Sequence, residues 1–272
     1  MIIQSAPAGF PRFVITNRQH SAFAAQMAQA FGNQAFDTIE PRAEMLFVID
    51  HHDYGWLTVD ECPAMDPATG LPYHLGSTPK EITVTTLVPA AEFNEAHHPY
   101  CGLLAAMHMW GLYTGRYGFS DRVVIDEMDS EHRMQFDEKL AELLKIQERL
   151  KRQLAGSPGT SGWVQKEHLF QNYRQLEFFD ALALYFNSTS ATERKSVTFK
   201  GVPQSTLKAV DVTVSPLDEA HYAFSPYPFT EDGITVCFGG RYLMQKERSV
   251  AEMRDALRQA PIEQQSVVFT SA

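Results

Sequence analysis

The residues best suited to chemistry in this chain are His52 and Asp53, which stand side by side after the apolar run 45–49. An imidazole nitrogen and a carboxylate oxygen at the end of a buried segment make a compact pair of metal ligands, suited to iron, manganese or zinc. Asp53 is also a candidate catalytic group. The dipeptide is common on its own, so its meaning depends on what other segments bring to it.

Three more metal-capable side chains lie on apolar faces of predicted helices. They are His20 in the first helix, His108 in a helix over 99–113, and Asp180 in a helix over 163–187. A buried aspartate is costly unless it is paired, and a buried histidine needs partners for both ring nitrogens. Taken singly, each has a structural alternative, as a hydrogen-bonded core histidine or as half of a buried ion pair. One shared metal site explains all of them together.

Other candidates have weaker support. His98, at the start of the helix over 99–113, is either a ligand of a second metal or a loop residue. Asp50 is a candidate catalytic group that takes or relays a proton. Weak candidates for substrate contact are Tyr54, Trp56 and His74, the last in a proline-rich loop over 62–79 of the kind that often binds ligands. Candidates to clamp a phosphate are Arg18, Arg116, Arg122 and Arg174.

Periodicity and breakers predict the elements that position these residues. Thr16 and Gln19 fit a capping box, which predicts that the first helix begins there. Further helices are expected over 41–51, 99–113, 130–154 and 163–187. Short strands are expected over 195–200, 209–215, 221–225, 234–238 and 241–243. Gly239-Gly240 is expected to be a hairpin turn, and a helix over 249–258 to close the chain.

These elements predict a mainly α fold, a helical bundle with a small C-terminal antiparallel β-sheet. The helical metal-binding core is expected over residues 1–190. The β-rich extension over 191–272 is expected to pack on it, so that the two form a single structural unit.

The composition limits the classes of partner that we expect for this chain. The chain has 272 residues and a formal net charge of −10, which argues against a general nucleic-acid binder because phosphate backbones need clustered Lys and Arg. Three cysteines without a CxxC spacing indicate a reducing compartment, the cytoplasm. No apolar run approaches the ~20 residues that span a bilayer. We therefore expect a small-molecule substrate and no nucleic-acid or membrane partner, with the oligomeric state open.

The order His20, His52-Asp53, Asp180 resembles that of the HD superfamily of metal-dependent enzymes, and residues 13–187 are similar to its helical core. This resemblance implies that these four residues bind a first metal. In members with two metals, Asp53 would bridge the ions, and His108 and His98 would hold the second.

A second resemblance covers nearly the whole chain. The stretches 52–56 (HDYGW) and 65–73 (MDPATGLPY), Met107-His108, and the stretches 180–185 (DALALY) and 226–229 (PYPF) are similar to an uncharacterised bacterial family known only as a domain of unknown function. That family supplies no substrate.

Three functions stay open, of which the HD resemblance implies the first two. The leading one is a metal-dependent hydrolase that acts on a phosphorylated small molecule through a metal-activated water. The second is a di-iron oxygenase of a small organic substrate, and the third a non-catalytic metal-binding protein. The expected cofactor is one or two divalent ions of iron, manganese or zinc.

Overall fold

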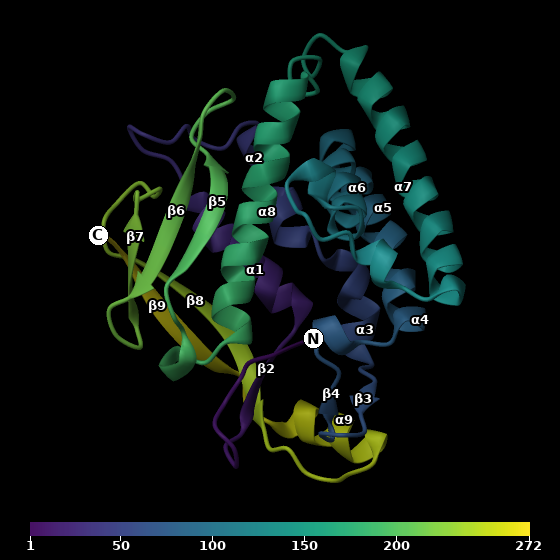
Figure 1. The fold of residues 1–272 in the computed structure, drawn as a ribbon, viewed down its shortest axis with the longest axis vertical. Helices are drawn as coiled ribbons and strands as arrows, with labels where there is room; N and C mark the ends of the chain where they lie inside the picture. The colour runs from purple at the N-terminus through teal and green to yellow at the C-terminus, as the bar shows by residue number, and fades with distance from the viewer.

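A helical body and a curled sheet lie side by side in the computed structural model, which describes residues 1–272 (Figure 1). Helix α8 runs between the two parts and contacts both. The longer helices are α1 (Asn17–Gln29), α2 (Arg42–His51), α5 (Leu87–His97), α6 (Pro99–Tyr113), α7 (Ser130–Ala155), α8 (Lys166–Ser188) and α9 (Val250–Gln259). The short helices are α3 (Leu57–Glu61) and α4 (Lys80–Thr83).

The main sheet has seven strands in the order β1-β2-β8-β9-β7-β6-β5. Its strands are β1 (Ile2–Ile3), β2 (Arg12–Ile15), β5 (Val197–Pro203), β6 (Ala209–Pro216), β7 (His221–Ser225), β8 (Ile234–Leu243) and β9 (Glu263–Ser271). Strands β7 and β9 pair in parallel, and the other neighbours are antiparallel. A separate two-stranded hairpin is formed by β3 (Met65–Asp66) and β4 (Leu71–Pro72).

The predicted fold class, mainly α with a small C-terminal antiparallel sheet, is wrong. The sheet is large and mixed, and it recruits β1 and β2 from the N-terminal end of the chain. The three residues Phe13, Val14 and Ile15 are all buried because β2 pairs with β8 at the far end of the sequence. Helices and sheet share one buried apolar core. The division of the chain at residue 190 stays a prediction.

Two local predictions are also wrong. Gly239 and Gly240 form no hairpin turn, since both lie inside the continuous strand β8. A side chain at Gly240 would meet the Phe13 ring at 2.6 Å, so glycine is needed there for packing. The helix over 249–258 does not close the chain, because β9 follows it.

Several helices begin where the sequence predicts. The Thr16 hydroxyl accepts a hydrogen bond from the Gln19 amide at 3.2 Å and so caps α1. Helix α6 has the predicted bounds. None of the helices combines the length and the apolar composition needed to cross a membrane.

Candidate metal centre

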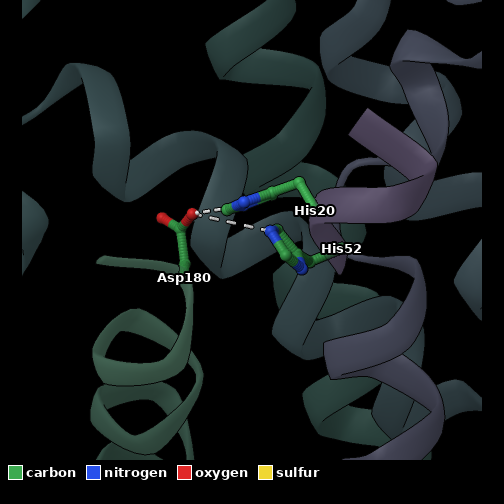
Figure 2. Close-up of side chains that lie close together, drawn as sticks. All are labelled: His20, His52 and Asp180. Atoms are coloured by element: carbon green, nitrogen blue, oxygen red, sulfur yellow. Dashed lines mark hydrogen bonds and ion pairs between the residues drawn. The ribbon is translucent and has the colours of Figure 1, made fainter. Parts of the chain in front are cut away.

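Four helices bring the five main predicted ligands together. His20 lies in the first turn of α1, His52 and Asp53 follow the end of α2, His108 lies in α6, and Asp180 lies in α8. His20 and His52 are 0% exposed, His108 1%, Asp180 5% and Asp53 8%. Figure 2 shows the His20 and His52 rings directed at the same Asp180 carboxylate. The centre is therefore almost fully enclosed.

The distances suit a shared ion. Nε2 of His20 lies 3.1 Å from Oδ1 of Asp180, and Nε2 of His52 lies 3.6 Å from the same oxygen. Oδ2 of Asp53 lies 3.6 Å from His52 Nε2 and 3.9 Å from His20 Nε2. Ligands placed ~2.0–2.2 Å from a tetrahedral ion are themselves about 3.3–3.6 Å apart. His108 joins His52 and Asp53 in a second group whose ligand atoms lie within 4.8 Å of one another.

Each histidine of the centre makes a hydrogen bond through Nδ1, the ring nitrogen that faces away from the shared space. Nδ1 donates to an oxygen acceptor, which fixes the ring and turns Nε2 toward the shared space, as in metal sites where an outer hydrogen bond orients the ligand. The acceptors are Asn187 Oδ1 for His20 at 3.0 Å, the Ile49 carbonyl for His52 at 2.8 Å, and a carboxylate oxygen of Glu177 for His108.

One ring nitrogen of the centre is fully buried and has no hydrogen-bond partner. Nε2 of His52 is buried, and its nearest carboxylate oxygens, 3.6 Å away, are beyond hydrogen-bond reach. Buried polar atoms are nearly always paired, so an orphan calls for an explanation. A cation between His52, Asp53 and Asp180 would pair this nitrogen and both carboxylates at once.

The charges of the centre shift the pKa values of His52 and Asp180 in opposite directions. Burial lowers the pKa of His52, but the negative charges of Asp53 and Asp180 close to the ring outweigh this effect and raise the pKa to about 9. Burial raises the pKa of Asp180, but its interactions with His20, His52 and His108 hold it well below the usual range. The carboxylates thus favour positive charge in this space, from a proton or from a metal ion.

Three residues support the centre in roles that were not predicted, and of these only Arg116 was a candidate, as a phosphate clamp. Glu177 holds His108, and Arg116 in turn places Nε 3.0 Å from Glu177 Oε2. Asn187 holds His20. Glu177 and Asn187 lie three residues before and seven residues after Asp180, on the same face of α8, so the helical periodicity that singled out Asp180 could have found both.

Three predicted site residues lie outside the cluster. His98 caps α6, since its Nδ1 accepts from the Tyr100 amide at 3.1 Å. His74 caps a short turn by accepting from the Gly76 amide at 3.0 Å. Asp50 makes two hydrogen bonds to the Arg18 guanidinium, at 2.7 and 2.8 Å. The structure gives none of them a contact with the five clustered ligands.

Tyr54 and Trp56 flank the centre. Both lie in a 3₁₀ turn directly after Asp53. Tyr54 stacks on Phe93 and, with Asp53, lines a cavity of about 10 Å³, which has room for one water at most. Trp56 is buried. Their contact with a substrate stays a prediction.

With this geometry defined, comparison with known proteins identifies the family. A family model described as "Protein of unknown function (DUF3891)" matches residues 1–245. The chain belongs to the DUF3891 family. The searches of the curated proteins and of the solved structures found no match.

The DUF3891 match includes all five clustered ligands together with Asn187 and Glu177, and it ends before α9 and β9. It agrees with the sequence resemblance to an uncharacterised family. Because the family description carries no reaction, the function of this DUF3891 protein has to be argued from the site.

Proposed function

We propose that the protein is a metal-dependent hydrolase of a phosphorylated small molecule, and that it binds one divalent ion. Its ligands are His20, His52, Asp53, His108 and Asp180. The observation that carries the proposal is the convergence of three histidines and two aspartates in two buried groups that share His52. HD superfamily membership is part of the proposal, because the ligands follow the order His, His-Asp, Asp.

A metal site accounts for the centre better than a structural polar cluster does. Burying two carboxylates and three imidazoles is costly unless every group is satisfied. Hydrogen bonds satisfy all three Nδ1 atoms, but they leave His52 Nε2 unpaired. A bound ion supplies the missing partner.

The ligand set favours one ion over two. A second ion would need donors beyond His108 and a bridging Asp53, and the predicted donor, His98, caps α6. We therefore favour the hydrolase over the di-iron oxygenase. Nitrogen and oxygen ligands in this mixture suit iron, manganese or zinc.

The chemistry that a divalent ion supplies in such a site is Lewis acidity, which lowers the pKa of water and polarises a phosphoryl oxygen. The chain contributes the rest. The Asn187, Ile49 and Glu177 oxygens orient the imidazoles, and packing of the four helices excludes bulk water. The small cavity at Asp53 has the size of a single water.

The test combines phosphate release with metal dependence. Protein purified without added metal should release inorganic phosphate from at least one member of a phosphomonoester panel, and a chelator should abolish the release. Asp180→Asn should lose it, whereas His51→Gln, which alters a ring stacked on Phe47, should keep it. Oxygen consumption without phosphate release would favour the oxygenase. Metal binding without either activity would favour a non-catalytic protein.

A further inference from the structure

A cavity of about 290 Å³ lies between α8 and β5, next to the metal centre. The cavity and the metal centre share Glu177, which lines the cavity and accepts a hydrogen bond from His108. Three cationic side chains and three phenylalanine rings stand out in the lining of the cavity: Arg116, Arg174, Lys200, Phe119, Phe178 and Phe199. Cations gathered around a cavity are notable in a chain whose net charge is −10.

Only one of these cations lacks a carboxylate partner. Arg116 pairs with Glu177, and Lys200 pairs with Asp211 at 2.6 Å. The Arg174 guanidinium instead donates to the Gly201 carbonyl and lies 4.6 Å from the centre of the Phe119 ring. Burial lowers the pKa of Arg174, as expected for a partly desolvated cation without a counterion. An anion in the cavity would supply that counterion.

The backbone makes room for this arginine. Gly201 in β5 has a φ of +61°, and a Cβ there would come within 1.9 Å of an Arg174 nitrogen. Glycine at this position therefore permits both the left-handed backbone and the close approach of the guanidinium. Any other residue would displace Arg174 from the cavity wall.

Tyr173 also lines the cavity, but its hydroxyl is turned away from it. The residue is 0% exposed, and a Cβ at Gly111 in α6 would come within 2.2 Å of the hydroxyl oxygen, so this oxygen is buried against α6. The oxyanion donor that the lining leaves without a carboxylate is therefore the Arg174 guanidinium, a group that binds phosphate well.

The segment that delivers Arg116 is strained. Gly115, Arg116, Tyr117 and Gly118 all have positive φ, and for the two non-glycine residues it is 50° and 56°. Such conformations are rare for L-residues and persist where the surrounding structure, frequently a functional site, requires them. Here the turn places Arg116 against Glu177 at the cavity wall.

We propose that this cavity binds an aromatic phosphate monoester, with Arg174 on the oxyanion and the phenylalanine rings along the aromatic group. The inference rests on the proposed function only in treating this ligand as the substrate. The binding itself needs no metal.

Calorimetric titration of phenyl phosphate into chelator-treated protein tests the inference. We expect wild type to bind phenyl phosphate more tightly than inorganic phosphate, because only the former contacts the rings. Arg174→Gln should weaken binding about tenfold or more, the loss expected for a hydrogen bond to a charged group. Lys200→Gln, at a largely exposed side chain, should weaken it in the same direction and serves if the first variant does not fold. The matched control is Arg122→Gln, which removes an exposed arginine paired with Glu127.

Two results would overturn the inference: wild type that binds no phenyl phosphate, or binding that is equal in wild type and both cavity variants. The two proposals can fail separately. If the protein holds no metal but binds phenyl phosphate in an Arg174-dependent way, the cavity proposal is supported and the hydrolase proposal is wrong. If the protein contains the metal but its affinity for phenyl phosphate is the same with and without Arg174, only the cavity proposal is wrong.

Discussion

At the scale of single residues, the centre depends on how its imidazoles are held. His108 is the clearest case, because its Nδ1 donates to a carboxylate that also pairs with Arg116. A carboxylate in this position raises the basicity of the ring and fixes its direction. Glu177 therefore matters to metal binding without being a ligand itself.

Glu177→Gln should lower metal affinity about 10- to 100-fold, the usual effect of losing an outer hydrogen-bond partner of a ligand. Competition with a chromophoric chelator measures this. The matched control is Glu148→Gln on the exposed side of α7, which should bind metal as wild type does. Equal affinity in the two variants would show that Glu177 does not support the centre.

The pKa of His52 predicts how the metal-free protein responds to pH. Its folded-state pKa of about 9 lies above the ordinary value of 6.5. As pH rises, the folded state therefore keeps a proton that the unfolded state has already released at lower pH. The resulting stabilisation is complete below about pH 6.5 and is lost as pH rises through about 9. Urea unfolding of chelator-treated protein should show a free energy of unfolding that falls between pH 7 and 9. His52→Gln should flatten that slope, and an identical slope in both proteins would contradict the assignment.

Helical periodicity could predict His20, His108 and Asp180 because it reports which face of a helix is buried. The pair His52-Asp53 was found instead by its place after an apolar run. The helical signal was also present for Glu177 and Asn187, one and two turns along α8 from Asp180. The role of His98 was harder to predict, because an N-cap depends on the backbone geometry at the start of α6 and not on which face of a helix is buried.

At the scale of elements, the sheet joins distant parts of the chain. Strand β2 pairs with β8, and Phe13 of β2 packs directly on Gly240 of β8. Local patterns indicate that a segment is extended, but they carry no information on a partner that lies more than two hundred residues away. The N-terminal contribution to the sheet could therefore not be predicted. In the C-terminal part, β5 to β8 were predicted approximately, but β9, which lies between β8 and β7, was missed.

Gly240→Ala tests this packing. Its Cβ would lie 2.6 Å from the Phe13 ring and 2.9 Å from the Val14 carbonyl oxygen. Overpacking of this kind costs about 1–3 kcal/mol in the free energy of unfolding, measured by urea denaturation. Gly162→Ala is the control, since nothing lies within 4 Å of the added atom, and it should change stability by less than about 0.5 kcal/mol. Equal stability of the two variants would contradict the contact.

At the scale of the whole molecule, the centre links helices that build both parts of the structure. Its ligands come from α1, α6 and α8 and from the two residues that follow α2, and α1 and α8 also pack on the sheet. The helices and the sheet share one core. Loss of the ion should therefore weaken the molecule as a unit rather than one end of it.

Chelation should lower the melting temperature in a single transition. An ion present at about 1,000 times its dissociation constant stabilises the folded state by about 4 kcal/mol. Calorimetry with and without a chelator measures the shift, and returning the metal should reverse it. An unchanged melting temperature would count against an ion that holds these helices together.

The most direct measurement is elemental analysis of protein purified without added metal, compared across wild type, His52→Gln and His51→Gln. The proposed centre predicts about one equivalent of a divalent metal in wild type and in the His51 variant, whose ring stacks on Phe47 outside the cluster. The His52 variant should retain its fold by circular dichroism and lose the metal. Full metal content in the His52 variant, or none in wild type, would contradict the central claim.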